Sequence, residues 1–356
     1  MPKEALCLKI SKEEGEKAII LAHKLEIVDE GLKVKRNQES IYIPLIRHPS
    51  KNELGALQGQ IQKFEITTYT FQEKEKKPKT LIEHLENKLP PHLLASLPKA
   101  IDFIGDIAII ELPPELNNYK GMIGEAVISV HRNVRTVLAK AGAISGTYRL
   151  REFMVIAGEP KTWTIHREYD CQYHVDIAKA YFSPRLSYEH SRVASLTKEG
   201  ETIIDMFAGV GPFSILIAKT RGNVKVYAID LNPYAIELLE KNVRLNRVEG
   251  KVHPLLGNAK EIIKERLVGV ADRVIMNLPE KAIEFVDSAC KALKPEGGTI
   301  HFYSFVNASS SLEDIKIRFT EEIKKCGRRL GKILFSRLVR ETAPYEWQAV
   351  IDVEIL

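Results

Sequence analysis

The sequence predicts an α/β protein in which a parallel sheet, with helices on both faces, follows two smaller α+β domains. Strand-like and helix-like runs alternate regularly after Asp170, which is typical of a parallel sheet. Residues 72–79, QEKEKKPK, contain a proline and no apolar residue, so they are typical of a linker. At roughly 150 residues per domain, a chain of 356 residues has room for two to three domains. The organisation that we expect is a small α+β domain at 1–65, a linker at 66–80, a second α+β domain at 81–166 and the sheet domain at 167–356.

The two smaller domains each mix strands and helices. In the first, a strand-like run at Ala5–Ile10 precedes a helix-like run at Glu13–His23. In the second, Leu81, Leu85 and Leu89 recur at the spacing of one helix face, and the two prolines that follow end the helix. The other elements expected there are a strand pair over Ile101–Leu112, a helix over Gly121–Gly142, and a hairpin that joins Tyr148–Ala157 to Thr162–His166.

The third domain has the clearest rhythm. The expected strands are Thr202–Phe207, Val224–Asp230, Lys251–Leu256, Arg273–Asn277, Gly298–Phe305, Lys332–Val339 and Gln348–Ile355. The expected helices are Gly211–Lys219, Pro233–Asn246, Ala259–Glu265, Ala282–Leu293 and Leu312–Cys326. Only Arg340–Trp347 joins the last two strands, so we expect that pair to be antiparallel.

Composition excludes several classes of protein. Lys and Arg number 52 against 47 Asp and Glu, a net charge of +5, so a polyanion partner would need local basic patches. The four cysteines lie far apart without a CxxC pair, which excludes a disulfide scaffold and a cysteine zinc site and fits a reducing cytosol. Neither an apolar run long enough for a membrane span nor a signal peptide is evident. We therefore expect a cytoplasmic protein.

The strongest motif is the strand-to-helix loop DMFAGVGPFS at 205–214. Its glycines let the backbone turn tightly and approach a ligand. A dinucleotide site would have a third glycine where Ser214 stands, and Pro212 removes a backbone donor that a pyrophosphate would use. Asp205 would repel a pyrophosphate but suits a ligand that carries an ammonium group. The loop therefore favours S-adenosylmethionine over NAD or a purely structural turn.

Residues after three further strands suit the same ligand. Asp230 ends a strand about 20 residues after the loop, where a carboxylate can accept hydrogen bonds from both hydroxyls of a ribose. Asn277 and Pro279 follow another strand, and an amide with exposed carbonyls can bind the edge of a planar base. Asn258 suits an adenine contact. An Asx-Pro turn at Asn277 and a helix N-cap at Asn258 are the structural alternatives.

These motifs together resemble class I methyltransferases and, more narrowly, the archaeal–eukaryotic tRNA (guanine-37-N1)-methyltransferase family. The segments that carry the resemblance are YFSPRLSYEH at 181–190, DMFAGVGPFS at 205–214, YAIDLNPYAIE at 227–237 and DRVIMNLPE at 272–280. The resemblance covers the second and third domains closely and the first more loosely. It implies a Rossmann-like methyltransferase sheet and methyl transfer from S-adenosylmethionine to N1 of guanosine 37. It also implies that the small N-terminal domain contacts the outer corner of tRNA, while the other two domains hold the anticodon stem-loop.

The same resemblance assigns individual residues. It implies catalytic roles for Glu189 as general base, for Arg149 as the donor to guanine O6, and for Asn277 as the residue that holds the base. The cofactor-binding residues that we expect are Tyr181, His190, Asp205, Phe207, Gly209, Asp230, Leu231, Asn258, Ala259, Asn277 and Pro279. His190 departs from the family pattern, in which arginine is frequent, and Glu280 also stands at a variable position.

The chemistry is consistent with these assignments. N1 of neutral guanine carries a proton and lies on the Watson–Crick edge, so the target base must be unpaired and a base must remove the proton. A carboxylate such as Glu189 can take it, and a guanidinium can stabilise the charge that grows on O6. The alternatives are that Glu189 only favours the start of a helix, and that Arg149 or Arg151, which we place on one strand face, contacts phosphate. No metal-ligand spacing is evident, although Mg²⁺ is left open.

A tRNA partner requires basic surfaces. Arg132 and Arg135 would share a stripe of the helix expected at 121–142, and the densest basic tract runs from Lys324 to Arg340. The residues that we expect to bind RNA are Arg132, Arg135, Arg151, Lys161 and Arg185. We expect a monomer. Two other functions stay open: transfer of an aminocarboxypropyl group to a modified guanosine 37, as in wybutosine-type biosynthesis, and RNA binding without catalysis.

Overall fold

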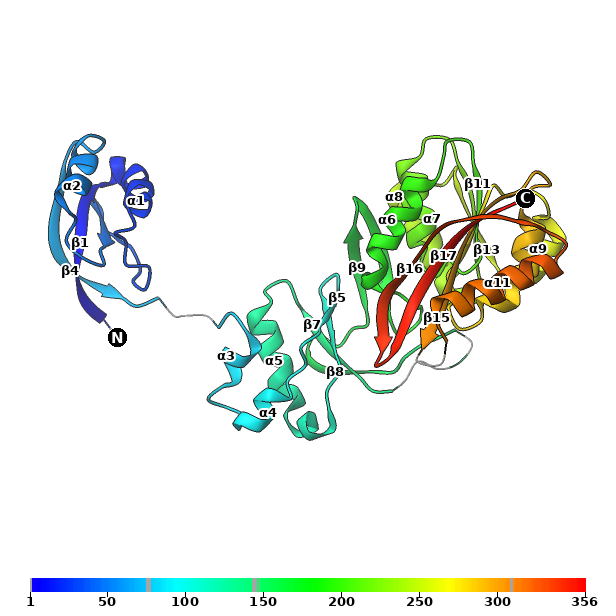
Figure 1. Ribbon diagram of the computed structural model, residues 1–356. Helices are drawn as coiled ribbons and strands as arrows, with labels where there is room; N and C mark the ends of the chain where they lie inside the picture. Colours follow the sequence, from blue (N-terminus) through cyan, green and yellow to red (C-terminus); the bar gives the residue numbers. More distant parts are fainter. Residues whose placement is uncertain (1, 75–77, 143–145, 147, 308–309) are drawn as a thin grey trace. The chain divides into compact units, whose positions relative to one another are not determined.

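The protein, seen in a computed structural model, forms two compact units, Met1–Lys79 and Thr80–Leu356 (Figure 1). The structure describes residues 2–74, 78–142, 146, 148–307 and 310–356. Each unit is built around its own buried apolar side chains. In the described part of the chain, no helix is both long enough and apolar enough to cross a membrane.

The first unit is a four-stranded antiparallel sheet with two α-helices, in the strand order β2-β3-β1-β4. Its elements are β1 (Pro2–Ser11), η1 (Lys12–Glu14), α1 (Gly15–Lys24), β2 (Lys35–Arg36), β3 (Ser40–Pro44), α2 (Lys51–Gln58) and β4 (Phe64–Gln72). Leu8 and Ile10 alternate with Cys7 along β1, so the sheet buries both of its faces. Leu8 and Ile10 belong to the cluster that includes Leu21 of α1, whereas Cys7 packs with Phe71 of β4.

Strand β4 corrects the expected boundary of the linker. It pairs with nearly all of β1, from Pro2 opposite Gln72 to Ile10 opposite Phe64. Residues 66–72 therefore lie in the sheet, whereas the sequence predicted a linker from residue 66. The alternating run FEITTYTFQ was the signal for a strand. Residues 75–77 of the predicted linker lie outside the described residues.

The second unit begins with a four-stranded sheet in the order β5-β6-β7-β8 and with helices on it. Its elements are α3 (Leu81–Leu85), α4 (Pro91–Ala95), β5 (Asp102–Ile104), β6 (Ile107–Ile110), η2 (Pro114–Tyr119), α5 (Lys120–Val130), β7 (Thr136–Lys140) and β8 (Phe153–Gly158). The strand pair expected over 101–112 is confirmed as β5 and β6. The helix expected over 121–142 is wrong beyond Val130, because residues 136–140 form β7, parallel to β6. Four of these residues, TVLA, are buried, as in a strand covered on both faces.

The expected hairpin around residue 158 is also wrong in its pairing. Strand β8 pairs with β7, whereas the segment after the turn forms β9 (Trp163–Glu168) and pairs with β10 (Cys171–Asp176). Strand β8 begins only at Phe153, so Arg149 and Arg151 do not share a strand face. Arg149 lies in a turn with a φ of 56°.

The remaining chain forms a seven-stranded sheet in the order β13-β12-β11-β14-β15-β17-β16, which confirms the predicted α/β class and the antiparallel final pair. Its strands are β11 (Thr202–Asp205), β12 (Lys225–Asp230), β13 (Val252–Leu256), β14 (Arg273–Met276), β15 (Gly298–Asn307), β16 (Leu330–Ala343) and β17 (Glu346–Ile355). Its helices are η3 (Pro184–Leu186), α6 (Ser187–Leu196), α7 (Pro212–Thr220), α8 (Pro233–Asn246), α9 (Ala259–Arg266), η4 (Ala282–Phe285), α10 (Val286–Ala292) and α11 (Leu312–Lys325).

Successive strand residues point into two separate apolar layers. Ile203 of β11 packs into the cluster that includes residues of α6, α7 and α8. Its neighbour Ile204 packs into the cluster that includes residues of α9, α10 and α11. The parallel order reverses at β11, whose neighbours are β12 and β14. In such sheets the ligand crevice lies at the carboxyl ends of the strands beside this reversal.

Candidate active site

A cavity of about 390 Å³ lies at the carboxyl ends of β11 to β14, a volume within the range of small-molecule sites. Most of the expected cofactor residues line it, namely Tyr181, Phe207, Gly209, Asp230, Leu231, Asn258, Ala259, Asn277 and Pro279. Arg149 lines it too. Of the expected cofactor residues, His190 and Asp205 are not among the described residues of its wall.

The glycine loop after β11 fits the cavity wall for two backbone reasons. Gly209 and Gly211 have φ values of 56° and 91°, which side-chain-bearing residues rarely adopt. A Cβ at Gly211 would also lie 2.2 Å from Cδ1 of Leu239 in α8. The Gly209 N–H donates to Oδ2 of Asp230 at 2.7 Å, so the loop is tied to the end of β12.

Asp230 is held in one orientation by backbone donors. Besides Gly209, the N–H of Asn232 donates to Oδ1 at 2.9 Å. Burial raises the pKa of Asp230, and hydrogen bonds from Asn232 and Gly209 oppose that rise. Each carboxylate oxygen has a second lone pair, so Asp230 can still accept two hydroxyl groups of a ligand in the cavity.

Asp205 lies beneath the loop, fully buried, and does not line the cavity. The Ser214 hydroxyl donates to its Oδ2 at 2.8 Å. The serine that replaces the third glycine of a dinucleotide motif therefore hydrogen-bonds the Asp205 carboxylate. Its Oδ1 is buried and has no hydrogen-bond partner among the described residues. Burial raises the pKa of Asp205 to about 7, and the nearby charge of Asp230 adds to the rise.

His190 does not line the cavity, and its described contacts lie with α7 and β9. Its Nδ1 lies 2.6 Å from Oε1 of Glu168 in β9, and its ring packs edge-on to Phe213 at 4.6 Å between centroids. The histidine is 1% exposed and joins α6 to the β9–β10 hairpin. This buried partner in β9 is not visible from the sequence, because it lies 22 residues away in the chain.

Asn277 is fixed by the C-terminal strands. Gln348 Nε2 donates to Asn277 Oδ1 at 2.9 Å, and Arg340 Nε donates to Gln348 Oε1, also at 2.9 Å. Arg340 further donates to the hydroxyls of Ser183 and Tyr181 at 2.6 and 2.9 Å. Arg340 and Gln348 both line the cavity, a role that we did not assign from the sequence. Arg340 was noticed there only as part of a basic tract.

Asn258 has both roles that the sequence left open. Its side chain accepts from the N–H of Lys260 at 3.0 Å and so caps α9. It also lines the cavity. The Asn258 side-chain oxygen therefore caps the start of α9, and the same residue lines the cavity.

Arg149 presents an unused donor. Its side chain is 15% exposed and packs over the Tyr181 ring, with 5.5 Å from Cζ to the ring centroid. Its Nη2 lies 3.3 Å from Oε1 of Glu280. Its Nη1 is buried and makes no hydrogen bond with any described residue. A buried guanidinium nitrogen without an acceptor is costly, so this nitrogen suits a ligand oxygen.

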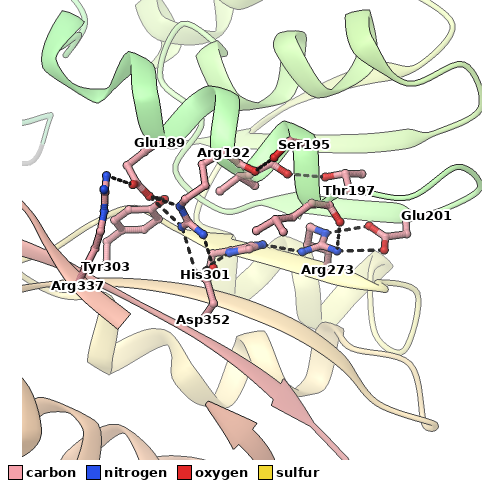
Figure 2. A network of polar contacts seen from close by, with 12 residues as sticks. Glu189, Arg192, Ser195, Thr197, Glu201, Arg273, His301, Tyr303, Arg337 and Asp352 are labelled. Carbon is pink, nitrogen blue, oxygen red and sulfur yellow. Dashed lines mark hydrogen bonds and ion pairs between the residues drawn. The ribbon is translucent and has the colours of Figure 1, made fainter. Parts of the chain in front are cut away.

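Glu189 lies in α6, near one end of a buried polar network (Figure 2). Arg192 donates twice to its Oε2, and the Tyr303 hydroxyl donates to the same oxygen at 2.9 Å. Arg337 Nη2 donates to Oε1 at 2.8 Å. Glu189 is not among the described residues that line the cavity. Two guanidiniums therefore balance the charge of the residue that was expected to act as the base.

The network continues beyond Glu189 through the sheet (Figure 2). Arg192 also donates to Asp352 in β17, and His301 Nδ1 lies 2.7 Å from Asp352 Oδ1. His301 Nε2 lies 2.7 Å from Nη1 of Arg273, which in turn pairs with Glu201. Burial opposes the ionised form of Asp352, but the His301 and Arg192 partners hold its pKa below the ordinary value. The C-terminal strands thus contribute to the surroundings of Glu189 as well as of Asn277.

The expected RNA-binding residues differ in whether their positive charge is already paired with a carboxylate. Arg132 and Arg135 are exposed and lie before β7, not on the predicted helix. Lys161 is paired with Asp106 and Glu159, and Arg185 with Asp102. Arg151 and Arg185 line a second cavity of about 380 Å³, which shares Arg149, Tyr181, Glu280, Phe305 and Arg340 with the first.

The described residues hold no group of three or more His, Cys, Asp and Glu side chains that could bind a metal ion. Mg²⁺, which the sequence left open, therefore has no support in this part of the chain. Cys290, in α10, is 2% exposed and packs in the apolar core.

Comparisons with known proteins cover nearly the whole chain. The family model described as "TRM5/TYW2 methyltransferase domain" matches residues 164–330. The models described as "TYW2 N-terminal domain" and "tRNA methyltransferase 5 N-terminal domain" match residues 81–162 and 7–53.

Individual relatives align from end to end. The chain is 39% identical to a protein of Pyrococcus abyssi named tRNA (guanine(37)-N(1))-methyltransferase Trm5b, over 98% of this chain and 99% of that protein. It is 34% identical to the protein of the same name from Methanocaldococcus jannaschii, over 98% of each. A solved complex of aTrm5 and tRNALeu has a TM-score of 0.76 at 33% identity, with 99% of this chain and 100% of that one covered.

Proposed function

The chain belongs to the family that carries the TRM5/TYW2 methyltransferase domain, and on that premise we propose that it methylates N1 of guanosine 37 in tRNA with S-adenosylmethionine. One observation supports this most strongly. One cavity is lined both by Asp230, which suits a ribose, and by Arg149, whose buried Nη1 suits the oxygen of a base. A methyltransferase needs its cofactor and its target base at one such site.

The residues around the glycine loop fit the proposed cofactor. Both oxygens of Asp230 keep a lone pair for ribose hydroxyls, and Asn258 is available to the adenine. Asp205 is buried beneath the loop and does not line the cavity, so its charge would act on a cationic amino-acid moiety through the loop and not by direct contact. S-adenosylmethionine supplies an electrophilic methyl carbon, to which guanine N1 forms its new bond as the sulfur–carbon bond breaks.

In the proposed mechanism, Arg149 donates from Nη1 to guanine O6, where negative charge grows as N1 loses its proton. Asn277 holds the base, and Glu189 takes the N1 proton on Oε1. The contacts of Glu189 set a condition for this role, because Arg337 occupies one lone pair of that oxygen. The Arg337 side chain is 36% exposed, and its Nε is buried without a partner among the described residues. A turn of Arg337 toward a phosphate would free Oε1 for the proton.

We propose tRNA as the partner of this chain, which acts as a monomer in the cytoplasm. Arg132, Arg135 and Arg151 are the expected RNA contacts whose guanidiniums form no ion pair with another described residue. Lys161 and Arg185 would first have to exchange their carboxylate partners for phosphate.

The product decides between this activity and its alternatives. The protein is incubated with tRNA transcripts that carry G or A at position 37, and with S-adenosylmethionine labelled either in the methyl group or in the amino-acid chain. We expect methyl label in 1-methylguanosine from the G37 transcript alone. The same assay is run on tRNA that already carries the modified guanosine 37, where label from the amino-acid chain in the nucleoside would indicate aminocarboxypropyl transfer. Binding without any label on either tRNA would indicate a protein without catalysis. EDTA tests Mg²⁺, and we expect it to leave the rate unchanged.

A further inference from the structure

A short series of hydrogen bonds ends at the proposed base-binding residue. Arg340 in β16 donates to the oxygen of the Gln348 amide in β17, and the nitrogen of that amide donates to Oδ1 of Asn277. All three residues line the cavity. Gln348 is 1% exposed, so its amide depends on these two neighbours rather than on bulk water.

Arg340 gives this series a fixed direction. An amide can be turned end for end, but a guanidinium has only donors. The atom of Gln348 that faces Arg340 must therefore be the oxygen, and the nitrogen must face Asn277. For the same reason Asn277 must meet Gln348 with its own oxygen. Turning either amide would set two buried donors against each other, which a buried site tolerates poorly. Arg340 is itself anchored by the hydroxyls of Ser183 and Tyr181.

The consequence is that Asn277 keeps its NH₂ group for the cavity. Among the hydrogen bonds of the described residues, the Asn277 amide accepts from Gln348, and its nitrogen donates to none. Arg149 Nη1 is a second donor without a partner among the described residues, and Arg149 lines the same cavity. A carbonyl oxygen has two lone pairs and can accept from both.

We propose that Arg340 and Gln348 are positioning residues that make the site specific for guanine over adenine. The inference rests on the proposed function, because it takes position 37 as the target. Guanine carries at C6 an oxygen that accepts hydrogen bonds, whereas adenine carries an amino group that donates them. Two fixed donors, from Asn277 and Arg149, match the first base and oppose the second. Specificity then depends on two residues that need not touch the base.

The test uses Gln348→Glu to reverse the hydrogen bond between residue 348 and Asn277. The new carboxylate still accepts from Arg340, but it now needs a donor from Asn277. The Asn277 amide therefore turns and offers its oxygen to the cavity. Dissociation constants and single-turnover rates are measured for tRNA transcripts with G, inosine or A at position 37. Inosine has the O6 and N1–H of guanosine but no 2-amino group.

We expect Gln348→Glu to weaken G37 and inosine-37 binding equally, by about 10- to 100-fold, and to spare A37. The ratio of the A37 to the G37 dissociation constant falls accordingly, while cofactor affinity stays within about two-fold. Ala343→Glu adds the same charge at an exposed position of the same hairpin and should leave the ratio unchanged. The inference is overturned if Gln348→Glu keeps the wild-type ratio, or if only G37 and not inosine-37 is weakened.

Two further variants keep the inference testable if Gln348→Glu does not fold, as judged by its melting curve. Gln348→Met removes the amide at similar volume and must still lower the ratio of the A37 to the G37 dissociation constant. Arg340→Met must lower the same ratio, because it removes the guanidinium that fixes the orientation of the Gln348 amide. A wild-type protein that makes no 1-methylguanosine would refute the proposed function, whereas the binding ratios would still report on this series of hydrogen bonds.

Discussion

The two sides of the cavity are built in different ways. The strand-end wall, formed by Phe207, Gly209, Asp230, Leu231, Asn258 and Ala259, follows β11, β12 and β13 in order. The other wall, formed by Arg149, Tyr181, Arg340 and Gln348, comes from a turn, from the segment before α6 and from the C-terminal hairpin. The first wall follows from the topology of a parallel sheet. The second depends on tertiary packing between distant segments, so we expect changes in it to affect the choice of substrate more than the binding of the cofactor.

The largest expected effect concerns Glu189, which is buried and does not line the cavity. Glu189→Gln should slow single-turnover methyl transfer by about 10²- to 10⁴-fold while leaving S-adenosylmethionine affinity unchanged, because general base catalysis is lost. The exposed Glu265→Gln in α9 serves as the control. A wild-type rate would reject Glu189 as the base. A melting temperature that falls while the rate holds would indicate that Glu189 only balances Arg192 and Arg337.

Arg149→Lys should reduce the same rate by about 10²- to 10³-fold. Lysine keeps the positive charge but cannot place one donor on Glu280 and another toward a base oxygen. The measurement is the rate at saturating tRNA, where a contact with phosphate alone would show little effect. Arg266→Ala in α9 is the matched surface change.

Asp230→Asn tests the strand-end wall alone. We expect S-adenosylmethionine to bind about 10- to 100-fold more weakly, since the amide NH₂ cannot accept from a ribose hydroxyl or from the Gly209 N–H. Titration calorimetry gives the affinity, and tRNA affinity should stay constant. An equal loss of tRNA affinity would show that the two walls are not independent. Asp287→Asn, exposed on α10, is the control.

A smaller effect is expected from the pH dependence of Asp205. Because its pKa is about 7 in the folded protein, against an ordinary 3.8, the native state favours the protonated form. Stability without cofactor should therefore fall as pH rises from about 4 to about 7, and Asp205→Asn should lack this component. Binding of the cationic cofactor should strengthen over the upper part of the same interval. Melting curves and calorimetry at several pH values measure the two trends, and identical profiles for both proteins would contradict them.

The smallest effect lies outside both walls. Arg132→Ala and Arg135→Ala should each weaken tRNA binding a few-fold and lower the slope of log affinity against log salt by about 1. Arg185→Ala should change the slope less, since Asp102 already holds its charge. If all three variants lowered the slope of log affinity against log salt equally, ion pairing with a carboxylate would not determine how much an arginine contributes to tRNA binding.

The contrast between the walls also explains what the sequence could predict. Phe207, Gly209 and Asp230 follow strands with a recognisable period, so short-range pattern was enough to place them beside one cavity. Gln348 stands 71 residues from Asn277, and nothing in its own surroundings marks it. Arg340 was visible only as a positive charge, and we assigned the tract that contains it to RNA. A basic residue cannot be told apart from a buried hydrogen-bond donor until its neighbours are known.

The errors in the fold have the same origin. Residues 136–140 carry a buried apolar run that suits a helix face or a covered strand equally well, and parallel pairing with β6 decides for the strand. His190 stays a predicted cofactor residue, because its neighbours in the sequence match a motif, but it does not line the cavity. A carboxylate in β9, Glu168, takes its ring nitrogen. In both cases the deciding partner is distant in the chain.

Strand β17 lies between β15 and β16, although it is the last of the three to be synthesised. While the ribosome is still translating residues 308–345, the outer edge of β15 has no partner strand. Unpaired edges of this kind invite aggregation and recruit chaperones. When the β16–β17 hairpin docks, β17 pairs with the free edge of β15. The same step brings Arg340, Gln348 and Asp352 into place. We therefore expect a nascent chain to form the strand-end wall early and to complete the lining of the cavity only when the sheet is complete.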